Sequence, residues 1–291
     1  MNDYTNDYLR TSLLDLLHAL GDDVRGIFLG GGYGLYLKQL HLAEAGERTL
    51  IDANLWPTPR TTQDLDLMLS AELVADTRSM TALRAALDKL KYEVIESAKY
   101  LQFVRAVSET QVVKIDLLTV QLDVLQSIPA IHADSRRARP IAADRPELHA
   151  HPTDGALALT EAPLVIEVAG TLSTGLPFAA PVTIPPSFSY LLMKLTAYRD
   201  RRNDDAKDLG SHHALDIFRI VAMLTEPELD QVRNNMQHFA ANAQVQSCVE
   251  LVRSDFSSRT ATGILTMRKH PLWQNDQQLA VFLETITRIV S

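Results

Sequence analysis

The stretch of this sequence best suited to chemistry is a pair of aspartates, Asp64 and Asp66, separated by one apolar residue. Leu65, Leu67 and Leu69 alternate with them, which predicts a short β-strand, because successive side chains of a strand point to opposite faces. Both carboxylates then share one face, and the leucines share a core-facing one. Two carboxylates this close repel each other unless a cation lies between them. Mg²⁺ held by carboxylates and substrate phosphates is the usual solution, and a solvated polar strand face is the alternative.

Two further stretches could join this pair. The apolar run Val24–Leu29 predicts a buried strand that ends at Gly30–Gly32, before a predicted helix over Tyr33–Ala45. A glycine turn at a helix N-terminus can bind a phosphate through backbone N–H groups, although it can also serve as a turn alone. Asp116 stands alone in the apolar predicted strand Gln111–Val120. A buried, unpaired carboxylate is costly, so we expect Asp116 to have a partner or a metal.

Composition sets the broad class of protein. The 291 residues are 46% apolar and 22% charged, as in an ordinary globular protein. Cys248 is the single cysteine, so an intrachain disulfide and a cysteine zinc site are both excluded. No signal peptide or membrane-spanning run is visible, and we expect a cytoplasmic protein with no membrane partner. The net charge of −8 argues against non-specific binding of nucleic acid by the whole surface.

The character of the chain changes near Pro185-Pro186. The part before this point mixes helical and strand patterns, and the part after it is almost entirely helical. We therefore predict an α+β fold with two domains, an α/β domain over residues 1–186 and a helical domain over residues 187–291. The expected helices are 4–20, 33–45, 71–91, 188–202, 212–224, 226–240, 243–255 and 276–290, and the expected strands include 24–29, 93–107, 111–120 and parts of 156–169.

The order of these motifs resembles the nucleotidyltransferase fold of the DNA polymerase β superfamily. The matching residues are Leu29, Gly31 and Gly32 (or Gly30 in an alternative register), then Asp64 and Asp66, then Asp116. The resemblance implies a mixed sheet with flanking helices. It implies that Asp64 and Asp66 hold the Mg²⁺ of a nucleoside triphosphate (NTP) and that the glycines bind its phosphates. Asp116 would complete a second metal site and activate the attacking hydroxyl.

The helical part is similar to the AbiEii-type nucleotidyltransferases. The similarity rests on Lys194-Leu-Thr-Ala-Tyr-Arg199, Asp205-Ala-Lys207-Asp208 and Leu215-Asp216, together with Arg60-Thr61-Thr62 ahead of Asp64. It implies catalytic roles for Lys194 and Asp208, with the Lys207-Asp208 pair opening the next helix. It also implies nucleotide contacts for Arg60, Thr62, Lys194 and Arg199, and a helical domain that contributes to the active-site cleft.

The resemblance implies a Mg²⁺-dependent enzyme that transfers NMP from an NTP to an acceptor hydroxyl and releases pyrophosphate. Members of this family are often toxins of toxin–antitoxin or abortive-infection loci, and some add nucleotides to the 3′ end of tRNA. The resemblance therefore implies a toxin of such a system, with RNA, in particular the tRNA 3′ end, as the expected acceptor. A cognate antitoxin is then an expected partner. A small-molecule or protein hydroxyl is the alternative acceptor, and a non-catalytic binding module that keeps the fold is the alternative of a different class.

Overall fold

The computed structural model describes residues 7–21, 25–60, 62–142, 146–274 and 276–291. Residues 4–6, the start of the helix predicted over residues 4–20, therefore lie outside the described residues, as do Val24 and Thr61. The chain divides into two compact units. Unit 1 comprises Met1–Lys38, Thr61–Thr153 and Leu159–Pro185, and unit 2 comprises Gln39–Arg60, Asp154–Ala158 and Pro186–Ser291. The segments Gln39–Arg60 and Asp154–Ala158, which precede residue 186, thus group with the C-terminal helices.

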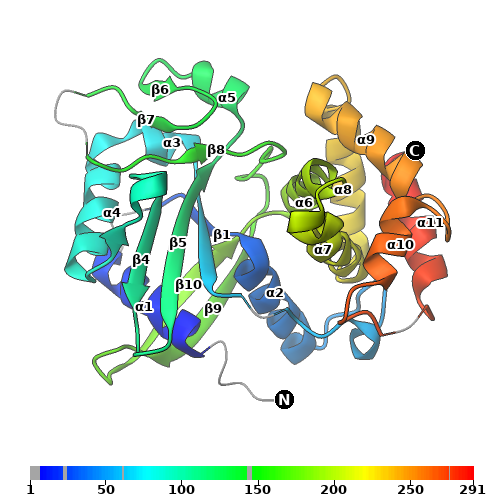
Figure 1. Cartoon of the computed structure of the whole chain (residues 1–291), viewed down its shortest axis with the longest axis horizontal. Helices are drawn as coiled ribbons and strands as arrows, with labels where there is room; N and C mark the ends of the chain where they lie inside the picture. Colours follow the sequence, from blue (N-terminus) through cyan, green and yellow to red (C-terminus); the bar gives the residue numbers. More distant parts are fainter. Residues whose placement is uncertain (1–6, 22–24, 61, 143–145, 275) are drawn as a thin grey trace. The chain divides into compact units, whose positions relative to one another are not determined.

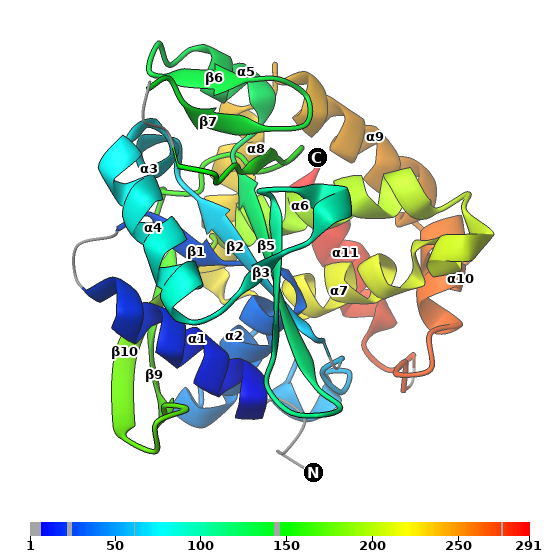
Figure 2. The same cartoon turned by 60° about the vertical axis from the view of Figure 1, so that its left-hand side comes forward.

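Unit 1 contains a mixed sheet in the order β1-β2-β5-β4-β3 with β8 paired to β5 (Figures 1 and 2). β2 and β5 are parallel, whereas β1 with β2 and β4 with β5 are antiparallel. The sheet strands are β1 (Ile27–Leu29), β2 (Asp64–Leu69), β3 (Glu93–Val94), β4 (Gln102–Ala106), β5 (Val112–Thr119) and β8 (His151–Pro152). The hairpins β6–β7 (Ile131–Ala133, Ala138–Pro140) and β9–β10 (Leu164–Thr171, Pro177–Ile184) and the helices α1 (Asp7–Leu20), α2 (starting at Gly31), α3 (Ala71–Ala75), α4 (Thr77–Lys89) and α5 (Leu122–Gln126) complete the unit.

One face of this sheet forms the core of unit 1. Leu65, Leu67, Val113 and Ile115 are fully buried, as the alternation along their strands requires. Helices α1 and α4 lie against this face (Figure 2), where α4 places a guanidinium over the ring of Phe103. Because Asp64 and Asp66 alternate with the buried leucines, their side chains lie on the opposite face, as the sequence predicts.

Three predicted elements of unit 1 are interrupted. The helix expected over residues 71–91 is two helices, because Asp76 ends α3 and caps α4 by accepting hydrogen bonds from Arg78 N (3.1 Å) and Ser79 N (3.2 Å). The strand expected over residues 93–107 is broken between β3 and β4 by a 3₁₀ turn. The strand expected within residues 156–169 begins only at Leu164, after a segment in which two alanines adopt positive φ.

Unit 2 is helical, as predicted for the end of the chain. Its helices are α6 (Ser187–Arg201), α7 (Ser211–Ala222), α8 (Glu226–His238), α9 (Ala243–Asp255), α10 (Thr262–Arg268) and α11 (Leu279–Ile289). Helix α8 begins with a capping box, in which Thr225 and Glu228 bond each other's backbone N–H groups. In the part of the chain that the structure describes, no helix combines the length and the apolar character needed to cross a membrane.

Candidate functional site

The register of β2 and β5 brings the three predicted aspartates to one face of the sheet. Asp66 lies directly opposite Asp116 on the parallel neighbouring strand, and Asp64 lies opposite Lys114. Neighbouring strands are about 4.8 Å apart, so residues paired in register are adjacent. All three aspartates are partly buried rather than freely exposed. The structure therefore assembles the carboxylates that the sequence separates by fifty residues.

Gly31 lies against the Asp66 side chain. It adopts a φ of +60°, and an added Cβ would fall 1.6 Å from Asp66 Oδ2, so only glycine fits. The preceding residue ties the same two segments together, because Gly30 N donates to the Asp66 carbonyl at 2.8 Å. Helix α2 (Gly31–Ala45) already begins at Gly31, whereas the sequence predicts a turn through Gly32. The positive end of the α2 dipole is thus beside the Asp66 carboxylate, which favours negative charge there.

Asp116 has a partner that the sequence analysis missed. Lys114 Nζ lies 3.0 Å from Asp116 Oδ2, and the two side chains are 29% and 17% exposed. Asp116 Oδ1 is buried and has no hydrogen-bond partner among the described residues. The spacing of Lys114 and Asp116 could have predicted this pair from the sequence, because residues two apart on a strand share a face. Asp116 therefore has one oxygen paired with an ammonium and one oxygen unsatisfied.

Asp64 and Asp66 are the candidate ligands for a divalent cation on this face of the sheet. Asp64 and Asp66 offer hard carboxylate oxygens on one strand face, which suit Mg²⁺. Within the described ranges, however, no three His, Cys, Asp or Glu side chains converge closely enough to hold a metal ion. Asp116 is the carboxylate committed to Lys114.

The start of β2 is held by Thr62. Its hydroxyl accepts a hydrogen bond from Asp64 N at 3.4 Å, and its carbonyl accepts one from the Tyr8 hydroxyl, also at 3.4 Å. Burial raises the pKa of Tyr8, and the nearby charge of Asp64 raises it further. Thr62 therefore lies beside the carboxylate pair, where the family resemblance implies a nucleotide contact.

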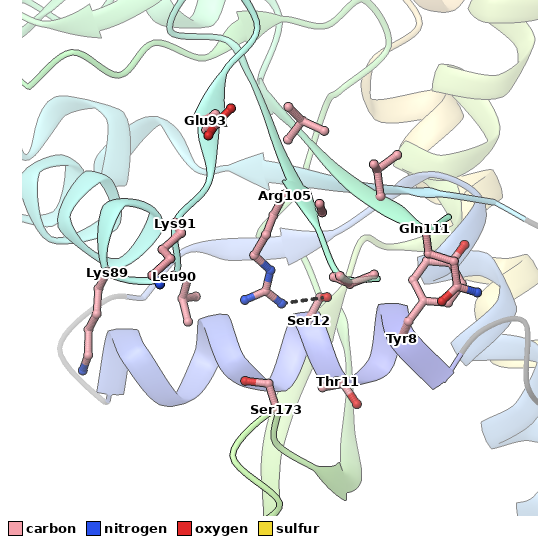
Figure 3. Close-up of a pocket in the computed structure, with 14 residues that line it drawn as sticks. Tyr8, Thr11, Ser12, Lys89, Leu90, Lys91, Glu93, Arg105, Gln111 and Ser173 are labelled. Carbon is pink, nitrogen blue, oxygen red and sulfur yellow. Dashed lines mark hydrogen bonds between the residues drawn. The ribbon is translucent and has the colours of Figure 1, made fainter. Parts of the chain in front are cut away.

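A pocket of about 990 Å³ in unit 1 is a separate feature (Figure 3). It lies between α1 and the β4–β5 hairpin and is lined by Ser12, Lys91 and Arg105 among others. Arg105 is opposite Val113 in the register, so it belongs to the core-facing side of the sheet. Its guanidinium donates to Ser12 Oγ (3.0 Å) and Asp15 Oδ2 (3.1 Å). We interpret the Arg105 cluster as support for α1, because the three aspartates do not line this pocket.

Unit 2 contains its own polar cluster, centred on Asp216 of α7. Asp216 is fully buried, and its Oδ2 accepts a hydrogen bond from Lys194 Nζ on α6 at 2.7 Å. Its Oδ1 accepts one from Arg219 Nη1 at 3.1 Å, and Arg60 Nη2 lies 3.8 Å from Oδ2. Arg219 is also buried and donates to Gln39 Oε1 at 2.8 Å. Three cationic side chains therefore contact a single carboxylate.

These charges set the protonation states of the cluster. Burial by itself would raise the pKa of Asp216, but the charges of Lys194 and Arg219 outweigh it and hold the pKa well below its usual range. Burial, together with the charges of Lys194 and Arg201, lowers the pKa of His213 to about 2. His213 is therefore neutral and accepts a hydrogen bond from Arg201. An excess of buried positive charge is costly, so this cluster is suited to contact an anion.

Arg199 and Asp208, the other two predicted residues of unit 2, have partners outside this cluster. Arg199 is paired with Asp200 (3.0 Å) and donates to Ser247 Oγ on α9 (2.9 Å). The expectation that Asp208 opens a helix is wrong, because α7 begins at Ser211 and Asp208 has a φ of +53° in the preceding 3₁₀ segment. Its carboxylate instead accepts a hydrogen bond from the Ser211 hydroxyl.

Asp216 and Arg219 are not among the site residues predicted from the sequence. Both lie within the apolar run 214–222, where a charged residue indicates a partner just as Asp116 does in β5. No family model matches this chain, and no curated protein matches it.

Proposed function

We propose that this chain is a nucleotidyltransferase that transfers NMP from an NTP to an acceptor hydroxyl. The observation that supports this most strongly is the β2–β5 register, which sets Asp66 beside Asp116 with Asp64 on the same face. The close approach of Gly31 to the Asp66 carboxylate adds a helix N-terminus at the same place. Catalysis of phosphoryl transfer consists mainly of positioning and charge neutralisation, and these groups can provide both.

In this proposal each group has a defined role. The acceptor oxygen forms a bond to the α-phosphorus while the bond to the β-phosphate oxygen breaks, so pyrophosphate leaves. Asp64 and Asp66 would hold Mg²⁺, which when bound neutralises charge on the phosphates. The Asp116 side chain, which is 17% exposed, would accept the hydrogen bond of the acceptor hydroxyl and then its proton. The N-terminus of α2 would face the phosphates.

The proposed acceptor is an RNA, in particular the tRNA 3′ end, and the AbiEii-type resemblance is what supports this choice. The net charge of −8 favours a specific acceptor over general RNA binding. A toxin with a cognate antitoxin would be supported if induced expression of this chain arrests growth and co-expression of a protein encoded beside it relieves the arrest. A small-molecule or protein hydroxyl is the alternative acceptor. The label of the nucleotide would then appear on a small molecule or a protein instead of on RNA.

The test is the transfer of label from each α-labelled NTP, with Mg²⁺ and total RNA, resolved on a gel. We expect Asp66→Asn and Asp116→Asn to reduce transfer by about 100-fold or more, as for the loss of other transition-state charge stabilisers. Asp88→Asn is the matched control, because Asp88 is an exposed residue of α4 that pairs with Arg84. Transfer by both site variants at the rate of the control would refute the proposal.

One observation favours a second candidate, a non-catalytic nucleotide-binding module. The Lys114–Asp116 ion pair already neutralises the charge of the third carboxylate, as is expected of a site that binds a nucleotide but no longer catalyses its transfer. Such a module would gain thermal stability from an NTP with Mg²⁺ by mass action but transfer no label. The gel assay and a thermal shift measurement on the same protein separate the two functions.

A further inference from the structure

We propose that unit 2 contains a binding site for a small amphipathic anion, a molecule with a hydrocarbon body and an anionic head. The site is a pocket of about 350 Å³ lined by residues of α8, α9 and α11, three helices labelled in Figure 1. Small-molecule sites are concave and mostly apolar, with a few polar groups that orient the ligand, and this volume is within their range. All three helices belong to unit 2, whereas the aspartates of β2 and β5 belong to unit 1, so the site goes beyond the proposed function.

The inner wall of the pocket is apolar. Met236 of α8, Val245 of α9 and Ile289 of α11 line it and are buried. Val249 lies one turn after Val245 on the same face of α9, and it is half-buried. A hydrocarbon body that packs against these side chains is removed from water, which favours binding.

The rim of the pocket is positively charged. It carries Arg233, Arg253 and Arg288 against one carboxylate, Glu250, in a chain whose net charge is −8. Arg253 Nη2 donates to the Val290 carbonyl at 3.3 Å, which holds its guanidinium beside the end of α11. The pocket is therefore complementary in charge to an anion.

Two of these arginines are available to a ligand. Arg253 and Arg288 are exposed, and neither forms an ion pair with a carboxylate in the part of the chain that the structure describes. A guanidinium group can donate two parallel hydrogen bonds to a carboxylate or a phosphate, and such charge-assisted bonds are stronger than neutral ones. An anionic head at the rim would thus pair with the arginines while its hydrocarbon body contacts the apolar wall.

The experiment measures the binding of three probes to the full chain by isothermal titration calorimetry. Octanoate has a hydrocarbon tail and a charge, octanamide has the same tail without the charge, and acetate has the charge without the tail. We expect octanoate to bind at a single site per chain, and octanamide and acetate to bind about tenfold more weakly or less, because each lacks one of the two interactions.

The variants locate the site. Arg253→Gln and Arg288→Gln should each weaken octanoate binding about tenfold, through the loss of a charge-assisted hydrogen bond, and should leave octanamide binding unchanged. Arg259→Gln is the matched control, because Arg259 is an exposed arginine of unit 2 that does not line the pocket. Val249→Asp places a negative charge in the apolar wall and should abolish octanoate binding.

Three results would overturn the inference. Octanoate could fail to bind, or it could bind no more tightly than octanamide, and the pocket would then not recognise an amphipathic anion. Octanoate could also bind equally well to Arg253→Gln, Arg288→Gln and Arg259→Gln, which would place the bound anion elsewhere on the chain. Because Arg253 and Arg288 are exposed, their replacement tests the site in a folded chain even if Val249→Asp does not fold.

Discussion

Replacing Gly31 with alanine tests whether the start of α2 and the Asp66 carboxylate form one packed unit. The added methyl group would lie 1.6 Å from Asp66 Oδ2 and 2.5 Å from its Cγ, so either the side chain or the backbone must move. A φ of +60° also disfavours alanine. Gly21→Ala is the matched control, because Gly21 has a φ of +62° with nothing within 4 Å of an added Cβ.

The magnitude follows from separating these two effects. An alanine held in the left-handed backbone conformation costs about 1–2 kcal/mol, and this cost is common to both variants. The gain from restricting the unfolded chain, about 0.4–1 kcal/mol, is also common to both. The collision with Asp66 is specific to Gly31 and should add about 1–3 kcal/mol, the usual cost of overpacking. We therefore expect Gly31→Ala to lower the free energy of unfolding by about 1–3 kcal/mol more than Gly21→Ala.

The assay is urea denaturation of the two variants and the natural chain, each checked for a two-state transition. A third comparison assigns the collision to its partner. In an Asp66→Ala background, the extra cost of Gly31→Ala should fall, because only the Asp66 Cβ, 2.9 Å away, remains in contact. Equal costs for Gly31→Ala and Gly21→Ala, or an extra cost that Asp66→Ala does not reduce, would refute the packing argument.

Three further predictions concern unit 2. Because burial lowers the pKa of His213 to about 2, the unfolded chain binds a proton below about pH 6.5 that the folded chain does not. The free energy of unfolding should therefore fall by about 1.4 kcal/mol per pH unit below that point. His213→Gln should remove this contribution to the pH dependence, which denaturation curves recorded at several pH values measure. Asp216→Asn should cost about 3–5 kcal/mol, with a smaller cost in a Lys194→Met background, because the variant leaves buried cations without their carboxylate. Burial raises the pKa of the Cys248 thiol to about 11, so Cys248 should react with a thiol reagent only after unfolding; rapid reaction in buffer would contradict this.

The sequence alone determined the local pattern of the site. Alternation with three leucines sufficed to place Asp64 and Asp66 on one face of a strand, and the burial of Leu65 and Leu67 agrees. The helical character of the chain after Pro186 was equally plain from its periodicity. These features are local, because a period of two or of 3.6 residues fixes which side chains share a face.

Tertiary structure decided which of these residues meet. The pairing of Asp66 with Asp116 depends on the parallel register of strands that are far apart in the sequence, and no local pattern specifies that register. The same holds for Asp216, whose contacts with Lys194 and Arg60 come from other segments of unit 2. Sequence shows that a charged residue stands in an apolar run and needs a partner, but only the fold selects the partner, because burial and packing set the distances between segments.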